Sequence, residues 1–182
     1  LSDTEQEFVR HALANYGFVR FPDQQLQDRD MVEFAKRFGS LEVNVAVTST
    51  DHPYPEIMTL SNIVENGKKI GLSDAGQGWH TDMSYSNPIA LANMLYGMKV
   101  PVRDGKPLGD TQFADMALAY DTLPIEVQHR IENLSAEHDF NKFWEMMRSK
   151  PGSDRPPLTP EQRAKKPPVT HPMVMRHPVS RK

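Results

Sequence analysis

Two residues near the middle of the chain have the types and the spacing needed to hold a metal ion. His80 and Asp82 lie in the aromatic segment 78–85, which is typical of a short strand and is followed by Asn87 and Pro88. Successive side chains of a strand point to opposite faces, so the imidazole and the carboxylate are expected on one face. One imidazole and one carboxylate are two of the three ligands of a non-haem Fe(II) triad. A His and an Asp that only hydrogen-bond to their neighbours would show the same spacing.

The composition narrows the class of protein. The 182 residues carry a formal net charge of −3, which gives no basic field for nucleic acid or for an anionic membrane. No apolar run approaches the roughly 18–20 residues of a membrane span. The absence of cysteine excludes disulfides, zinc–thiolate sites and thiol nucleophiles. The polar, acidic start is unlike a signal or transit peptide, so we expect a cytoplasmic protein.

Helices and strands are expected on both sides of the His-x-Asp segment. Capping residues and helical spacing of apolar residues place helices at about 4–16, 28–38, 116–123 and 124–134. Strands are expected at 17–22, 56–62 and 169–179. The apolar run 89–98 fits a helix or a strand, and its short length and flanking prolines favour a buried strand. The expected fold class is mainly β with flanking helices, that is, α+β.

The chain is expected to form one domain, 1–182, because its length is typical of a single domain. The proline-rich segment 150–168 lacks a periodic apolar pattern and is expected to be a flexible loop. The strand-like segment 169–179 ends close to Lys182. Because a half-built strand leaves an unpaired edge, we expect the domain to be truncated there.

Further segments accompany the His-x-Asp pair in a fixed order. They are Tyr16-Gly-Phe-Val-Arg-Phe21, Phe34-Ala-Lys-Arg-Phe-Gly-Ser-Leu-Glu42, Trp79-His-Thr-Asp82, Gly109-Asp-Thr-Gln-Phe113, Ala119-Tyr120, Ala136-Glu-His-Asp-Phe140, Thr170-His-Pro-Met-Val174 and Arg176-His-Pro178. Together they resemble the taurine dioxygenase and 2,4-dichlorophenoxyacetate dioxygenase family of Fe(II)/2-oxoglutarate oxygenases. The resemblance covers nearly the whole chain. It implies a double-stranded β-helix, or jelly roll, that is incomplete here at the C-terminus.

The resemblance also implies roles for single residues. His80 and Asp82 would be the first two iron ligands, and Thr111 would contact the carboxylate of the co-substrate 2-oxoglutarate. A second reading of Thr111 is the N-cap of the following helix. The third ligand, a distal histidine, and the arginine that binds 2-oxoglutarate are expected beyond Lys182.

The remaining histidines are not expected to bind the metal. His171 and His177 precede the missing strands by the match, and as His-Pro dipeptides they are expected at strand ends. His138 is expected to be structural.

The activity implied by the resemblance is hydroxylation of a small anionic organic substrate by O2, with release of succinate and CO2. Sulfonates, sulfate esters and aryloxy acids are the expected substrate types.

His52 and Tyr54 resemble a segment that faces the substrate anion, although their spacing is one residue shorter, and a loop-capping tyrosine is the other reading. Asn62 is expected in a lid by its position. Phe143 and Trp144 match either an apolar pocket wall or core. Relatives are often dimers or tetramers.

Two other functions stay open. A redox-inert zinc or manganese hydrolase built on His80, Asp82 and a nearby histidine would act without 2-oxoglutarate or O2, but the chain has no motif of the His-Glu-x-x-His type. A non-catalytic jelly-roll protein that binds a small acid is the second alternative, because two ligands alone hold iron poorly.

Overall fold

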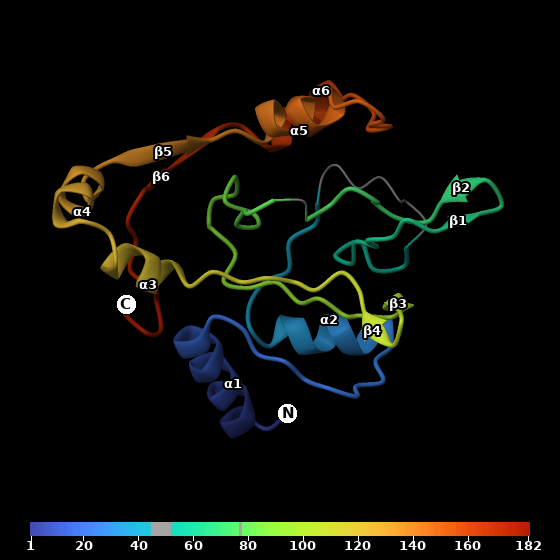
Figure 1. The fold of residues 1–182 in the computed structure, drawn as a ribbon, viewed down its shortest axis with the longest axis horizontal. Coiled ribbons are helices and arrows are strands. Elements are labelled where there is room, and N and C mark those ends of the chain that lie inside the picture. Colours follow the sequence, from blue (N-terminus) through green and yellow to red (C-terminus); the bar gives the residue numbers. More distant parts are fainter. Residues whose placement is uncertain (45–51, 77) are drawn as a thin grey trace. The chain divides into compact units, whose positions relative to one another are not determined.

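A computed structural model describes residues 1–44, 52–76 and 78–182 of the chain (Figure 1). The chain divides into two compact units. Unit 1 consists of Leu1–Gln25, Met94–Ala136 and His171–Lys182. Unit 2 consists of Leu26–Asn93 and Glu137–Thr170.

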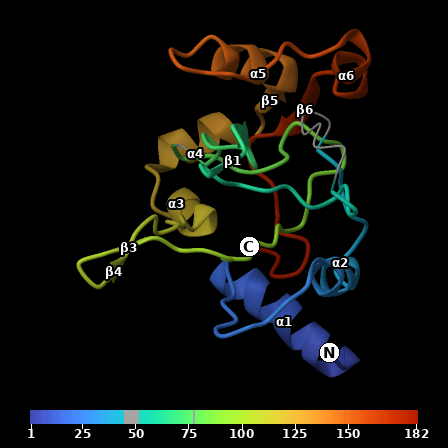
Figure 2. The same cartoon turned by 90° about the vertical axis from the view of Figure 1, so that its right-hand side faces the viewer.

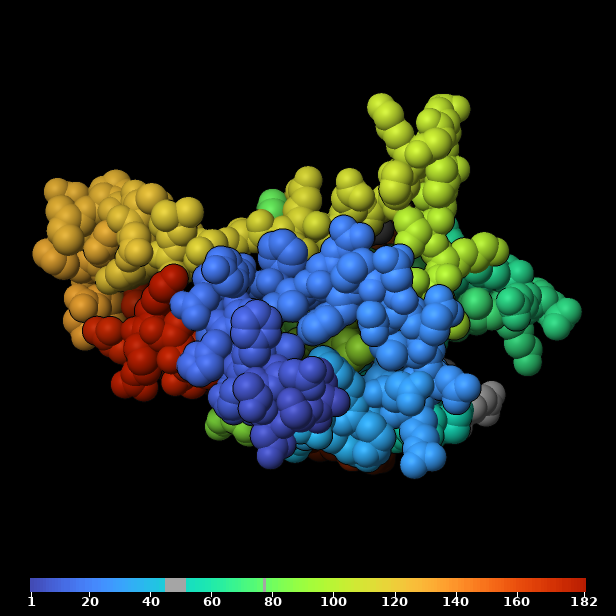
Figure 3. Space-filling model, turned by 90° about the horizontal axis from the view of Figure 1, so that it is seen from below, coloured from blue at the N-terminus to red at the C-terminus, as the bar shows by residue number. Residues whose placement is uncertain are grey.

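Unit 1 contains three helices and a short hairpin. They are α1 (Asp3–Tyr16), β3 (Val102–Arg103), β4 (Lys106–Pro107), α3 (Met116–Asp121) and α4 (Ile125–Ile131). The helix α1 begins with a capping box between Ser2 and Glu5 and ends at Gly17, whose φ of 78° is the left-handed C-cap conformation. Asp104 and Gly105 both have positive φ, as a two-residue turn between antiparallel strands requires. The resulting β3–β4 hairpin protrudes, and its side chains are exposed (Figure 3).

Unit 2 contains the segment with the metal-binding pair. Its complete elements are α2 (Asp28–Lys36), β1 (Val64–Glu65), β2 (Lys68–Lys69), α5 (Phe140–Arg148) and α6 (Pro160–Lys165). The helices α5 and α6 lie side by side (Figures 1 and 2), and Arg163 Nη2 donates to Glu145 Oε1 at 2.6 Å between them. The strands β5 (Ser135–His138) and β6 (Val169–Pro172) form a two-stranded sheet, and the division into units falls within both strands.

The core of unit 2 forms around one face of α5. Phe140, Trp144 and Leu158 are buried together, and Tyr85 packs against them with its ring centroid 4.6 Å from that of Phe140. The indole Nε1 of Trp144 donates to the carbonyl of Pro156 at 2.8 Å, so the buried polar atom of this residue has a partner. Of the two readings of Trp144, the structure supports core.

The expected helices are confirmed, with ends within a few residues of those that the sequence predicts: α1, α2, α3 and α4 occupy the four predicted ranges. The prediction of a loop at 150–168 is partly wrong, because this segment contains α6. Thr159 and Gln162 form a capping box there, and Pro160 occupies the first turn, where its missing N–H costs no hydrogen bond.

The strand predictions are less successful. Residues 17–22, 78–85 and 89–98 are not strands, and the segment 56–62 contributes a single bridge between Leu60 and Leu72. A mixture of helices and strands is confirmed, but among the described residues helices hold more residues than strands, which form three separate two-stranded sheets. A strand needs a neighbouring strand to hydrogen-bond with, and sequence pattern alone does not show whether one is near. No jelly roll is seen in the described residues, so this part of the fold stays a prediction.

Candidate metal centre

The segment Gly78–Tyr85 is a series of bends and turns, which corrects the strand predicted for it. Gly78 has a φ of 82° and Met83 a φ of 58°, and both values are incompatible with an extended strand. The turn still brings the predicted pair together. His80 Nε2 lies 3.2 Å from Asp82 Oδ1, with the side chains 49% and 52% exposed. Both groups are therefore accessible to a metal ion and to further ligands.

Both ring nitrogens of His80 face oxygen atoms. Nδ1 lies 2.9 Å from the carbonyl oxygen of Gly78, while Nε2 faces Asp82. A neutral imidazole has a hydrogen on only one nitrogen. With that hydrogen on Nδ1, donated to Gly78, the lone pair of Nε2 faces a carboxylate oxygen. A second proton or a shared cation on Nε2 makes this contact favourable. A histidine that donates one N–H to a backbone carbonyl and binds metal through the other nitrogen is the common arrangement.

The spacing of the pair fits two ligands of one ion. Histidine nitrogens and carboxylate oxygens bind a first-row ion such as zinc at about 2.0–2.2 Å, so two such atoms at a right angle around an ion lie about 3 Å apart. The observed separation of 3.2 Å is close to this value, so the two donor atoms need little movement to share an ion. The donor set and its spacing therefore fit a first-row metal ion.

The second oxygen of Asp82 has a partner that the sequence did not predict. The amide Nδ2 of Asn93 donates to Asp82 Oδ2. The signal for it was present, because Asn93 is a polar residue inside the otherwise mostly apolar run 89–98. The two oxygens of this carboxylate thus have different neighbours, an imidazole and an amide.

A polar cluster lies a few residues after the metal-binding pair. The Oγ of Ser86, which is 6% exposed, donates to Glu42 Oε1 at 2.7 Å, and Lys166 Nζ donates to Ser86 Oγ at 2.8 Å. Lys166 also pairs with Glu42 and lies 5.6 Å from the ring centroid of Tyr85. Burial, and then the carboxylates of Glu42 and Asp82, raise the pKa of Tyr85 to about 12. The tyrosine is therefore neutral at physiological pH and serves as a packing residue next to the pair.

An ion pair holds the loop that leads into the metal-binding pair. Arg155 donates to both carboxylate oxygens of Asp74, from Nε at 3.0 Å and from Nη2 at 2.7 Å. The Arg155 side chain is 6% exposed, and its guanidinium carbon lies 4.7 Å from the centre of the Trp144 ring. This contact connects the loop before Gly78 with the core around α5.

The residues predicted to face the substrate are held by local contacts. Nδ1 of His52 accepts a hydrogen bond from the backbone N–H of Tyr54 at 3.1 Å, and Nε2 lies 3.4 Å from Asp28 Oδ2. Nδ1 also lies 2.9 Å from the backbone carbonyl oxygen of Tyr54. His52 thus joins its own turn to the first residue of α2. Asn62 is exposed near the Leu60–Leu72 bridge. The substrate roles of His52, Tyr54 and Asn62 stay predictions.

Thr111 belongs to unit 1, whereas His80 and Asp82 belong to unit 2. Thr111 is exposed and lies ahead of α3. The N-cap of α3 is Asp115, whose Oδ1 accepts from the N–H groups of Ala117 at 2.9 Å and Leu118 at 3.0 Å. The N-cap reading of Thr111 is therefore wrong. Its contact with 2-oxoglutarate stays a prediction.

The described residues hold no group of three or more His, Asp or Glu side chains that could bind a metal ion. His138 and His171 lie in the strands β5 and β6. His177 directly precedes the turn 178–180, and its Nδ1 accepts from the N–H groups of Val179 at 3.2 Å and Ser180 at 3.1 Å. The metal-binding pair is thus joined by no third histidine or carboxylate in this part of the chain.

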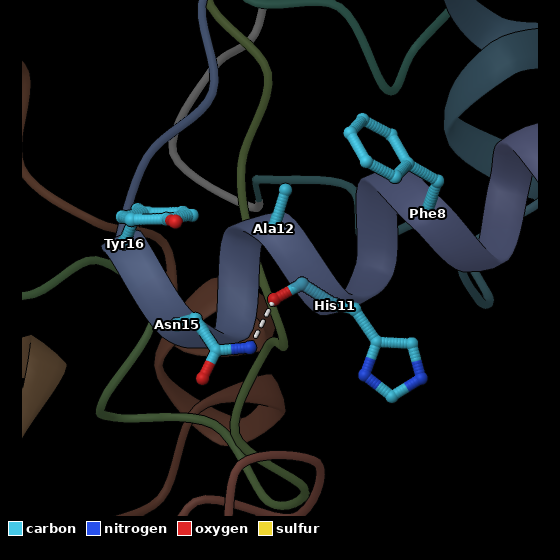
Figure 4. Close-up of a pocket in the computed structure, with 5 residues that line it drawn as sticks. All are labelled: Phe8, His11, Ala12, Asn15 and Tyr16. Atoms are coloured by element: carbon cyan, nitrogen blue, oxygen red, sulfur yellow. Dashed lines mark hydrogen bonds between the residues drawn. The ribbon is translucent and has the colours of Figure 1, made fainter.

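A shallow hollow lies over one face of α1 (Figure 4). It is lined by Phe8, His11, Ala12, Asn15 and Tyr16, all from this one helix. Asn15 Nδ2 donates to the carbonyl of His11 at 2.8 Å (Figure 4). Its walls contain none of the predicted site residues.

No helix in the described ranges is long and apolar enough to cross a membrane.

Comparison with known proteins gives a family match over the whole chain. The family described as "Taurine catabolism dioxygenase TauD, TfdA family" matches residues 1–182. The match agrees with the resemblance seen in the sequence motifs.

Individual relatives are similar over most of this chain but are longer than it. The alpha-ketoglutarate-dependent 2,4-dichlorophenoxyacetate dioxygenase of Cupriavidus pinatubonensis is 32% identical over 148 residues, which is 76% of this chain and 50% of the relative. The pentalenolactone F synthase of Streptomyces avermitilis is 31% identical over 80% of this chain and 47% of the relative. The alpha-ketoglutarate-dependent sulfonate dioxygenase of Saccharomyces cerevisiae is 28% identical over 100% of this chain and 42% of the relative. The chain spans about half the length of these relatives.

Proposed function

Because the chain belongs to the taurine catabolism dioxygenase TauD, TfdA family, we propose that it contributes the first two metal ligands of an Fe(II)- and 2-oxoglutarate-dependent dioxygenase. The observation that carries the proposal is the separation of 3.2 Å between His80 Nε2 and Asp82 Oδ1. Two donor atoms of the right chemical types, both accessible, lie at the spacing of neighbouring ligands around one ion.

Each residue of the turn has its own task in this proposal. The carbonyl of Gly78 accepts from Nδ1 of His80, which leaves the lone pair of Nε2 for the metal. Asp82 contributes Oδ1 and one negative charge, which partly compensates the charge of a divalent ion. Iron and 2-oxoglutarate, when bound, supply the oxidation of a C–H bond by O2 with release of succinate and CO2.

The rest of the site belongs to the same proposal. Thr111 contacts a carboxylate of 2-oxoglutarate, and a histidine from outside residues 1–182 is the third ligand. The greater length of the relatives supports this division. The jelly roll is proposed as the fold to which this chain contributes, because the family match covers residues 1–182.

The proposed substrate is a small organic anion. The names of relatives support this class, since they include a 2,4-dichlorophenoxyacetate dioxygenase, a sulfonate dioxygenase and, in Acinetobacter baylyi, an alkylsulfatase. His52, Tyr54 and Asn62 are proposed to lie near this anion.

Anaerobic addition of Fe(II) and 2-oxoglutarate to the full-length protein tests the proposal. A weak visible charge-transfer band is expected, and it should disappear in His80→Ala. His129→Ala is the matched control, since His129 is an exposed residue of α4 that the proposed site does not use, and it should leave the band unchanged. A band that persists in His80→Ala would show that His80 is not a ligand. A protein that turns over substrate without 2-oxoglutarate would instead support the hydrolase alternative.

A further inference from the structure

The carboxylate of Asp82 has two oxygens in two different environments. Oδ1 faces His80 Nε2 at 3.2 Å, whereas Oδ2 accepts a hydrogen bond from Nδ2 of Asn93. Because an ionised carboxylate only accepts hydrogen bonds, the amide must present its NH2 group to it. Asn93 and Asp82 both belong to unit 2, and they are eleven positions apart in the sequence.

We propose that Asn93 is a positioning residue that fixes Asp82 as a ligand through Oδ1 alone. This inference rests on the proposed metal site and adds a residue to it. Asn93 does not touch the metal in this arrangement. It acts by occupying Oδ2 and by stopping rotation of the carboxylate group.

The physical reason is preorganisation. A free aspartate carboxylate rotates about a broad terminal torsion and presents either oxygen, or both, to an ion. A charge-assisted hydrogen bond to one oxygen selects one orientation before the metal arrives. The other ligand of the pair is held in the same way, because His80 Nδ1 is directed at the Gly78 carbonyl. Each of the two ligands therefore has one partner outside the metal site.

Binding through one oxygen also matters for the number of ligands. A carboxylate that binds through both oxygens takes two positions around the ion. With Oδ2 held by Asn93, Asp82 takes one, and a site of two histidines and one carboxylate keeps three of six positions for co-substrate and O2. The amide of Asn93 thus keeps the second carboxylate oxygen of Asp82 from taking a coordination position of the ion.

The substitution that tests this role is Asn93→Leu, which keeps the branch at Cγ and removes the donor. Mn(II) binding to the full-length protein without 2-oxoglutarate is measured by EPR of the free ion. Loss of a partner of a metal ligand typically weakens binding by 10- to 100-fold, and we expect about tenfold here because both side chains are exposed. Asn93→Gln, which keeps the amide donor, should recover part of the affinity. Leu95→Ala, an exposed residue two positions on, should bind Mn(II) like the parent.

A second measurement needs no metal. In the apo protein, Asp82→Asn should shift the side-chain amide NMR signals of Asn93, while those of Asn15, which donates to His11, should stay in place. This measurement also covers the case in which Asn93→Leu does not fold.

The outcomes separate the two proposals. A parent that binds Mn(II) and an Asn93→Leu variant that binds it within twofold would overturn the role of Asn93 and leave the metal site standing. Unchanged Asn93 amide signals in Asp82→Asn would overturn the role as well. A folded parent that does not bind Mn(II) would refute the proposed metal site and, with it, this inference.

Discussion

Removal of the Arg155 guanidinium should destabilise unit 2 and loosen the loop that leads to His80. The side chain makes two charge-assisted hydrogen bonds to Asp74 and lies over the Trp144 ring, and it is 6% exposed. Arg155→Met keeps the apolar stem in place and removes all three contacts. The carboxylate of Asp74, left alone, regains part of its hydration because it is 31% exposed.

The expected magnitude follows from these contacts. Hydrogen bonds to a charged group are worth about 1.5–3 kcal/mol, and a cation–π contact adds about 0.5–1 kcal/mol. Because water reaches Asp74, we take the low end and expect a loss of about 2 kcal/mol in the free energy of unfolding. The ion pair between Lys69 and Asp154 is the matched control. It joins neighbouring residues of the same two segments, but its side chains are 45% and 66% exposed. Lys69→Ala should lower the free energy of unfolding much less than Arg155→Met, because water screens an exposed ion pair.

Urea unfolding followed by tryptophan fluorescence measures both effects, since Trp144 lies beneath Arg155. The double variant Arg155→Met/Asp74→Asn should be less destabilised than the two single changes predict together, because they remove one shared interaction. Equally small losses in Arg155→Met and Lys69→Ala would refute the buried role of Arg155.

Two further predictions concern Tyr85 and the segment that leads into α3. One of the five tyrosines should ionise near pH 12, later than an ordinary tyrosine near 10, and Tyr85→Phe should remove this late step from an ultraviolet absorbance titration. Since the pKa of Tyr85 is raised in the folded state, its contribution to stability is complete below about pH 10 and is lost as the pH rises toward about 12. An absorbance titration with no late step would contradict the burial of Tyr85. Asp115→Ala should cost about 1 kcal/mol by removing the N-cap of α3, whereas Thr111→Val should leave the unfolding free energy unchanged and weaken 2-oxoglutarate binding. Thermal unfolding and 2-oxoglutarate titrations measure these effects. If Thr111→Val lowered the unfolding free energy and left 2-oxoglutarate binding unchanged, while Asp115→Ala did not lower the unfolding free energy, Thr111 would be the N-cap.

Much of the helical structure follows from local sequence. The residues that begin and end the helix α1 can be recognised in the sequence: Ser2 and Glu5 form a capping box, and Gly17 is the C-cap. These signals act within a few residues, so no knowledge of the fold is needed to use them. The error at Thr111 has the same local origin, since Thr111 and Asp115 are both good capping residues and only the backbone shows which one the helix follows.

The metal-binding pair could be found from the sequence, although its predicted backbone was wrong. Residues at positions i and i+2 approach each other in a strand and also in this turn, so His80 and Asp82 meet in either case. The partners of the pair could not be found in the same way. Asn93 reaches Asp82 across eleven positions, and Arg155 reaches Asp74 across eighty-one, and contacts at such separations depend on the path of the chain.

The most direct test of the metal site is an anomalous difference map from crystals of the full-length protein grown with Mn(II). We expect a single peak that lies about 2.1–2.2 Å from both His80 Nε2 and Asp82 Oδ1, with Asp82 Oδ2 still in contact with Asn93. A folded protein whose map shows no peak at this pair, or a peak held by other histidines such as His138 or His171, would contradict the assignment of His80 and Asp82 as ligands.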